Sequence, residues 1–71
     1  MNPVSPKKLL HTKWTAVEPV RKEKHFLVTA VHEDDAGNPR TVTLEAVHSK
    51  RERELPWRDL KDTAQWKAGW V

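Results

Sequence analysis

Cysteine is absent from the sequence, which excludes both disulfide bonds and metal sites built on thiolates. Only two glycines are present, so the chain can hardly form a glycine-rich phosphate loop. The longest apolar run is Phe26–Val28, far too short to cross a bilayer, and no signal-type apolar stretch follows the lysines near the N-terminus. These absences predict a soluble, cytoplasmic protein with no membrane partner.

Catalytic groups are also missing in any recognisable arrangement. The few serines and threonines have no nucleophile–base context. The acidic pairs Asp34–Asp35 and Glu52–Glu54 fall in a predicted turn and on a charged strand, where the burial that would raise a carboxyl pKa is not expected. The sequence therefore predicts a protein that is not an enzyme and uses no cofactor.

The side chains that most often bind metals are the four histidines, His11, His25, His32 and His48. Two of them, His25 and His32, are seven residues apart, so on one strand they point to opposite faces. Only His25 and His48 could meet, across a hairpin in one register, and no third ligand completes a site. No metal site is predicted.

Aromatic residues other than tryptophan are nearly absent, and this decides what the core is made of. With one phenylalanine, one methionine and no tyrosine, a chain of 71 residues has little besides its four tryptophans to bury. We therefore predict that Trp14, Trp57 and Trp66 are structural. Trp70 follows Gly69 near the C-terminus, where it either packs as a final staple or lies exposed and stacks on an unpaired base.

Alternation of apolar and polar residues predicts strands over Lys13–Val20, over His25–Glu33, and after the turn-forming residues Asp34–Pro39. The charged stretch Lys50–Pro56 keeps a period of two and predicts a short exposed strand. The predicted fold is one domain over residues 1–71 and mainly β: a small curled antiparallel sheet or SH3-like barrel of three to five strands. An open three-stranded meander with a C-terminal helix is the alternative. The register stays open, because His25–Glu33 is apolar on both faces.

Short helical turns are predicted to accompany the sheet. Ser5, followed by a proline, can cap one near the N-terminus, and Pro56 opens another over "PWRDLK". Towards the C-terminus, Asp62 or Thr63 can cap a further turn through "AQWK", which Gly69 would end.

Positive charge is in modest excess. Thirteen Lys and Arg against ten Asp and Glu give a net charge of +3 and a pI near 9.5, which suits a polyanionic partner. On a strand, Arg51 and Arg53 share one face and leave the neighbouring glutamates on the other, as a surface that follows phosphates requires. The alternative is that these charges form ion pairs across strands and keep an edge soluble. The candidate nucleic-acid-binding residues are Lys50, Arg51, Arg53, Arg58, Lys61 and Trp70.

The function that these residues favour is a non-catalytic binding module for RNA or single-stranded nucleic acid. The alternative is a protein-interaction or structural accessory protein that docks through an open strand edge or an exposed tryptophan, since Trp and Arg are also enriched in protein hot spots. The arrangement of charge in space distinguishes the two. A contiguous basic face favours nucleic acid, and a neutral apolar patch rimmed by charge favours a protein.

Several motifs resemble a known family. The stretches "SPKKLLHTKWTAVEPVRKEKHFLVTAV" and "LEAVHSKRERELPWRDLKD", with a closing "W..GW", resemble a family of small tryptophan-rich proteins found in bacteria. The resemblance covers nearly the whole chain, and "KWTAVEPV…KEKHF" and "PWRDLKD" are its most specific parts. Because the function of that family is unknown, the resemblance implies no catalytic or binding residues, and the functional prediction depends on the residues themselves.

Overall fold

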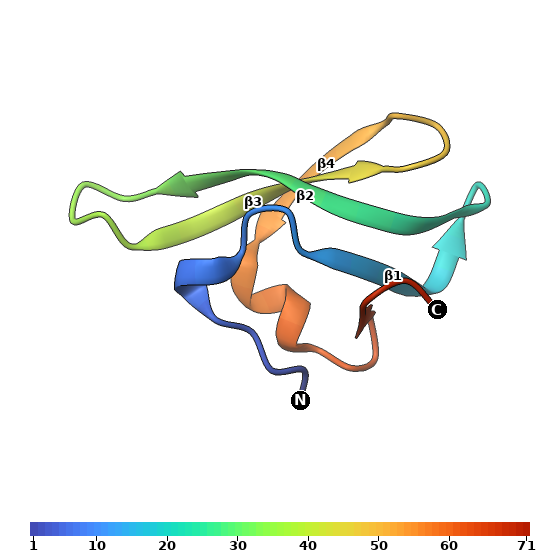
Figure 1. The fold of residues 1–71 in the computed structure, drawn as a ribbon, viewed down its shortest axis with the longest axis horizontal. Helices are drawn as coiled ribbons and strands as arrows, with labels where there is room; N and C mark the ends of the chain where they lie inside the picture. Colours follow the sequence, from blue (N-terminus) through green and yellow to red (C-terminus); the bar gives the residue numbers. More distant parts are fainter.

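The computed structural model describes all residues from Met1 to Val71 and contains one five-stranded antiparallel sheet with two short 3₁₀ turns (Figure 1). The elements in chain order are η1 (Pro6–Lys8), β1 (Lys13–Val20), β2 (Glu23–Glu33), β3 (Pro39–Ala46), β4 (Glu52–Pro56), η2 (Trp57–Lys61) and β5 (Trp66–Ala68). The mainly β fold predicted from the sequence is confirmed. No helix in the structure has the length and apolarity needed to span a membrane.

The sheet is a meander whose last strand returns to the first. Its order is β4-β3-β2-β1-β5, so β4 and β5 are the two edges and no strand pairing joins them. The curled open sheet is thus the form observed, rather than a closed barrel or a three-stranded meander with a C-terminal helix. The curl is nevertheless strong, because the side chain of Arg53 on β4 reaches within 5.7 Å of the Trp66 ring on β5.

The β2–β3 hairpin fixes the register that alternation left open. Asp34 Oδ1 accepts hydrogen bonds from the N–H groups of Ala36 and Asn38, and Gly37 takes the positive φ that the turn needs. Phe26 then lies opposite Ala46. As a consequence, the buried positions of both strands point to one face of the sheet.

That face carries the core, and both 3₁₀ turns lie against the same side (Figure 1). Eleven buried apolar residues form one cluster: Leu9, Trp14, Ala16, Phe26, Val28, Val42, Leu44, Ala46, Trp57, Leu60 and Trp66. The predicted structural role of three tryptophans is confirmed, since Trp14, Trp57 and Trp66 are only 3%, 8% and 2% exposed.

Two predicted helical details are wrong. Ser5 precedes η1 as expected, but its side chain makes no capping hydrogen bond. The predicted turn through "AQWK" is instead a tight turn followed by β5. The carbonyl of Asp62 accepts the N–H groups of Gln65 and Trp66, after which Trp66 pairs with Ala16 of β1. Pairing with the open edge of β1 overrides a local preference that is weak over so few residues.

Candidate functional site

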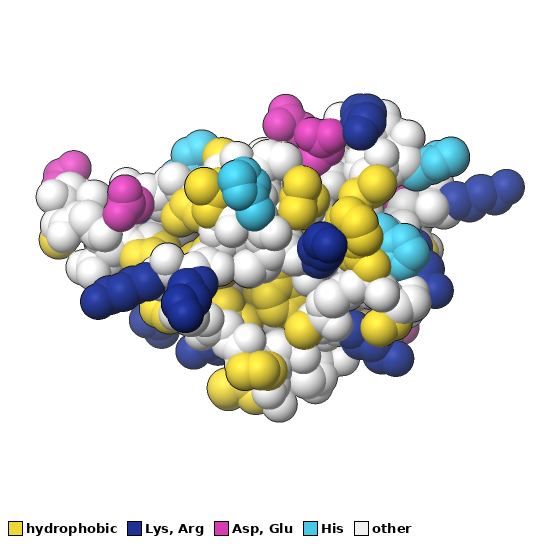
Figure 2. Space-filling model, viewed as in Figure 1, with side chains coloured by type: hydrophobic (Ala, Val, Ile, Leu, Met, Phe, Trp, Pro, Cys, Tyr) yellow, Lys and Arg dark blue, Asp and Glu magenta, His cyan; other side chains and the backbone are white.

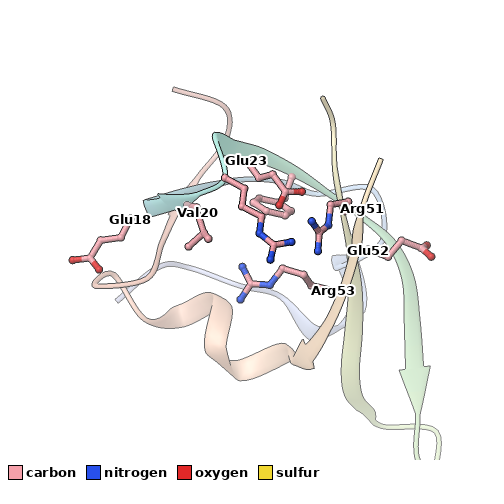
Figure 3. Close-up of a pocket in the computed structure, with 9 residues that line it drawn as sticks. Glu18, Val20, Glu23, Arg51, Glu52 and Arg53 are labelled. Atoms are coloured by element: carbon pink, nitrogen blue, oxygen red, sulfur yellow. The ribbon is translucent and has the colours of Figure 1, made fainter. Parts of the chain in front are cut away.

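A groove runs between the curled-in β4 edge and the second half of β1, and we call it the seam (Figure 3). Phe26 of β2 lies at its base. One wall is formed by residues of β1 and the β1–β2 turn, and the other by residues at the start of β4. The residues that line it are Ala16, Glu18, Val20, Arg21, Glu23, Phe26, Arg51, Glu52 and Arg53.

The seam exists because β1 stops pairing regularly with its neighbouring strands before its own last residue. It pairs with β2 from Lys13 to Thr15 and again only at Val20, with a register shift between. Pro19 lies in that interval and has no N–H to donate, as a strand that ends or lies at an edge requires. On its other side β1 pairs with the short β5 only as far as Ala16. Beyond Ala16 the Val17 N–H still donates to the Gln65 carbonyl, and the following residues Glu18 and Val20 line the seam across from Arg53.

Arg53 is the central side chain of the seam. It lies opposite Leu44 in the β3–β4 register, so it points to the same face as the core. Its guanidinium carbon lies 5.9 Å from the centre of the Phe26 ring and 5.7 Å from that of Trp66. These two rings are packed edge to face. A guanidinium held over aromatic rings is orientationally restricted, while the N–H groups at its edge stay available to an anion.

Arg51 brings a second guanidinium into the seam from the same end of β4, and neither arginine has a carboxylate partner. The ion pairs of the structure are Lys50–Glu45 at 3.8 Å and His32–Glu54 at 3.6 Å, and no arginine side chain donates a hydrogen bond to the protein. Because unpaired guanidinium groups are strong donors to oxyanions, the seam can bind phosphate or carboxylate groups.

Three glutamates also line the seam, and they differ in direction. Glu18 and Glu52 point away from the guanidinium groups of Arg51 and Arg53 (Figure 3). Glu23 points into the groove on the side of Arg51 (Figure 3), and its carboxylate accepts a hydrogen bond from the Ser49 hydroxyl, which leaves its negative charge in place. The seam is thus a mixed surface in which the arginines are free of ion pairs but not free of nearby negative charge.

The structure divides the candidate residues among separate places. Arg51 and Arg53 come together in the seam, as their shared face predicts. Lys50 occupies the β3–β4 turn with a φ of 66° and is paired with Glu45, so its charge is partly satisfied. For Lys50, the alternative of ion pairing describes what is observed, although the pair joins the turn to β3 and not two strands.

Arg58 and Lys61 belong to η2 and lie over one indole. Their charged ends are 5.6 Å and 5.1 Å from the centre of the Trp57 ring. Trp57 is buried, so this ring is not free to stack on a base. The two cations themselves remain exposed or half-exposed and without ion pairs.

Trp70 lies on the opposite face of the sheet from the core. It anchors the C-terminus through a hydrogen bond, and part of its ring is exposed. Its Nε1–H donates to the Phe26 carbonyl at 2.9 Å, and the following N–H of Val71 donates to the hydroxyl of Thr15. The indole is 41% exposed, and Lys13 Nζ lies 4.7 Å from its centre. It is therefore a candidate stacking surface with a cation beside it, separate from the seam.

Figure 2 shows how charge is distributed over one face of the molecule. Lys and Arg side chains lie mainly towards the two ends and the lower part of this face, with one near its centre and one at its upper edge, while Asp and Glu lie at the upper edge and the left end and apolar side chains are spread between them. Positive charge is not gathered there into one uninterrupted patch. On this face the contiguous basic surface that would favour nucleic acid is not observed, and the nucleic-acid prediction therefore depends on the arginines of the seam.

The sequence does not predict two features of the seam and the residues beside it. Arg21 is not among the candidate binding residues, yet it lines the seam across from β4. Trp66 was assigned to the core, and its Nε1–H is buried with no hydrogen-bond partner. No local pattern marks either, because both depend on how strongly the sheet curls.

The histidines are dispersed. Because Phe26 pairs with Ala46, His25 lies opposite Val47, whose N–H donates to the His25 carbonyl, and not opposite His48. No cluster of three or more His, Asp or Glu side chains in the structure could hold a metal ion.

Residues 12–71 match the tryptophan-rich protein family DUF2389, and the chain therefore belongs to this family, whose function is unknown. No curated protein and no solved structure matches the chain.

Proposed function

We propose that this tryptophan-rich protein is a non-catalytic binding module whose partner is RNA or another single-stranded nucleic acid. The observation that carries the proposal is the convergence of Arg51 and Arg53 in the seam without carboxylate partners. Guanidinium groups recognise phosphate oxygens through paired N–H donors, and phosphate contacts supply most of the affinity of sequence-independent nucleic-acid binding.

Other candidate residues extend this surface beyond the seam. Arg58 and Lys61 would contact further phosphates near η2, and Lys50 would add charge at the β3–β4 turn. On the outer face, Trp70 would stack on an unpaired base, for which the ring is sufficiently exposed. The cytoplasm, where RNA is abundant, is the compartment that this proposal requires.

A single strand suits the geometry better than a duplex. The seam is a groove between β4 and the second half of β1, and stacking on Trp70 requires an unpaired base. Duplex RNA presents a regular array of phosphates but no free base faces. We therefore expect single strands to bind more tightly than duplexes of the same length.

A second candidate function is docking of a protein strand, because β4 pairs only with β3 and its other edge is open to the seam. An added strand at that edge would find backbone partners and the Arg53 side chain together. This candidate predicts binding that is insensitive to nucleic acid and only weakly sensitive to salt.

Titration of labelled single-stranded RNA, duplex RNA and single-stranded DNA, followed by fluorescence anisotropy, tests the proposal at about 50 and about 200 mM salt. We expect binding of the single strands that weakens at least tenfold between the two salt concentrations. Absence of binding at the lower concentration would overturn the proposal and leave the protein-docking candidate.

A further inference from the structure

The seam has the size of a small-molecule site. Its volume is about 390 Å³, within the range of roughly 300–1,000 Å³ in which proteins hold small organic ligands and far more than a bare phosphate requires. A second hollow continues from it and shares part of its wall. The residues that line this second hollow are Ala16, Glu18, Val20, Arg53, Ala64, Gln65 and Trp66.

The seam combines charged and apolar side chains. Arg53 comes from β4, Arg51 directly precedes that strand, and Arg21 comes from the β1–β2 turn, so cationic donors reach the groove from both sides. Glu18, Glu23 and Glu52 also line the groove, and its apolar lining consists of Ala16, Val20 and Phe26. A ligand with a phosphate at one end and a flat, weakly polar body at the other matches the arginines together with this apolar lining.

Trp66 supplies a second and independent observation. Its side chain is 2% exposed and lines the second hollow, while its Nε1–H has no acceptor in the protein. A buried N–H without an acceptor costs free energy, which a hydrogen bond from it would recover. Because this N–H is itself covered by protein, a ligand oxygen would reach it only after a local shift of the surrounding side chains. Arg53 lies over the same ring, so a ligand bound at its guanidinium would change the environment of the Trp66 indole.

We infer that the seam is a nucleotide subsite, which takes one phosphorylated nucleotide with its phosphate between Arg51 and Arg53 and its sugar or base against the apolar wall. This inference rests on the proposed function and names the part of the strand that the seam holds. It also predicts that a free 5′-mononucleotide binds at the same place, with an affinity in the millimolar to micromolar range typical of a small fragment.

The test is NMR observation of ¹⁵N-labelled protein during titration with uridine 5′-monophosphate, uridine, ribose 5-phosphate and inorganic phosphate. The indole N–H signals of the four tryptophans report on separate places in the fold. We expect the nucleotide to shift the Trp66 indole and the Arg53 Nε–H signals to saturation. Uridine should leave them unchanged, and inorganic phosphate should need at least tenfold more ligand.

Variants locate the effect. Arg51→Ala and Arg53→Leu should each weaken nucleotide binding about tenfold, the loss expected for one charge-assisted contact. Arg40→Ala is the matched control, because Arg40 is an exposed arginine on β3 outside the seam. If Arg53→Leu unfolded the protein, Arg51→Ala would still decide the result.

The outcomes separate this inference from the proposed function. In one outcome, single-stranded RNA binds, but the nucleotide shifts neither the Trp66 nor the Arg53 signal, or shifts only that of Trp70. This outcome overturns the nucleotide subsite and keeps the proposed function. In another outcome, the nucleotide saturates the seam, and RNA oligomers bind no more tightly than the nucleotide does. This outcome supports the subsite and overturns the strand-binding function. Equal affinity for inorganic phosphate and nucleotide overturns the nucleotide assignment.

Discussion

At the scale of single residues, the tryptophans divide by environment and not by sequence context. Trp66 is buried against Phe26 at a ring distance of 5.3 Å, while Trp70 is held by one indole hydrogen bond beside Lys13 and His25 and stays 41% exposed. Composition was sufficient to predict the buried tryptophans, since the chain has one phenylalanine, no tyrosine and one methionine to share the core with its leucines and valines. The placement of Trp70 was left open by the sequence because it depends on where the C-terminus turns.

Replacement of these tryptophans by alanine should therefore have unequal effects on stability. We expect Trp57→Ala and Trp66→Ala each to lower the free energy of unfolding by about 3–5 kcal/mol, which would largely unfold so small a domain. Trp70→Ala should cost about 1 kcal/mol, mainly its hydrogen bond. Urea denaturation followed by circular dichroism measures the difference, and a stable, fully folded Trp66→Ala protein would show that the core is misidentified.

Arg53 combines packing with charge, and the two contributions can be separated. It is exposed and makes no ion pair, but its side chain lies over Phe26 and Trp66. We expect Arg53→Leu to change the free energy of unfolding by less than about 1 kcal/mol, because leucine keeps apolar contact and loses only the cation–π attraction. The same variant should lose at least tenfold in RNA affinity. A large loss of stability would mean that the guanidinium is a structural group.

At the scale of elements, four strands follow from alternation and one does not. Lys13–Val20 was predicted with the bounds that β1 has, and the hairpin around Asp34–Pro39 follows from its turn residues. The last strand, β5, has only three residues, too few for a pattern to distinguish it from a helical turn. Its position is set by the turn before it and by the open edge of β1. Because β1 is distant in the sequence, this pairing cannot be predicted from the residues of β5 alone.

The turn at Asp62 should make the stability of the β5 region depend on pH. A hydrogen bond from the Gln65 side chain, joined by one from the Ala64 N–H, lowers the pKa of Asp62 below its ordinary value of 3.8. Since the folded-state pKa is the lower one, the contribution of Asp62 is present above 3.8 and is lost as the pH falls through the folded-state pKa. The stability difference between the natural protein and Asp62→Ala should therefore be larger at neutral pH than in strong acid, as urea denaturation at both pH values would show. A difference of equal size at both would contradict this role.

Gly69 ends β5 and directs Trp70 onto the outer face. Its φ is +80°, and a Cβ added there would meet no atom within 4 Å, so a substitution costs backbone strain and not a clash. We expect Gly69→Ala to destabilise the protein by about 1 kcal/mol and Gly69→Asn by less, because asparagine tolerates the left-handed conformation better. Thermal denaturation of both variants tests this order, and equal stability of Gly69→Ala and the natural protein would refute it.

At the scale of the whole molecule, the seam is a product of curvature. Arg53 and Trp66 meet because β4 and β5, the two edges of the sheet, curl towards each other. The sequence predicts that Arg51 and Arg53 share a strand face, but not which residues lie across from that face. Twist and curl accumulate over all the strands, so they cannot be obtained from the pattern of any one of them.

The salt dependence of single-stranded RNA binding tests the central claim most directly, measured for the natural protein and two double variants of equal charge. Arg51→Ala with Arg53→Leu removes the seam cations, and Lys7→Ala with Lys8→Ala removes two exposed cations of η1 outside the seam. The account predicts that only the seam variant loses affinity by more than tenfold and that its slope of log affinity against log salt falls by about two. Equal losses in both variants would show that RNA responds to overall charge, and the seam would then have no part in binding.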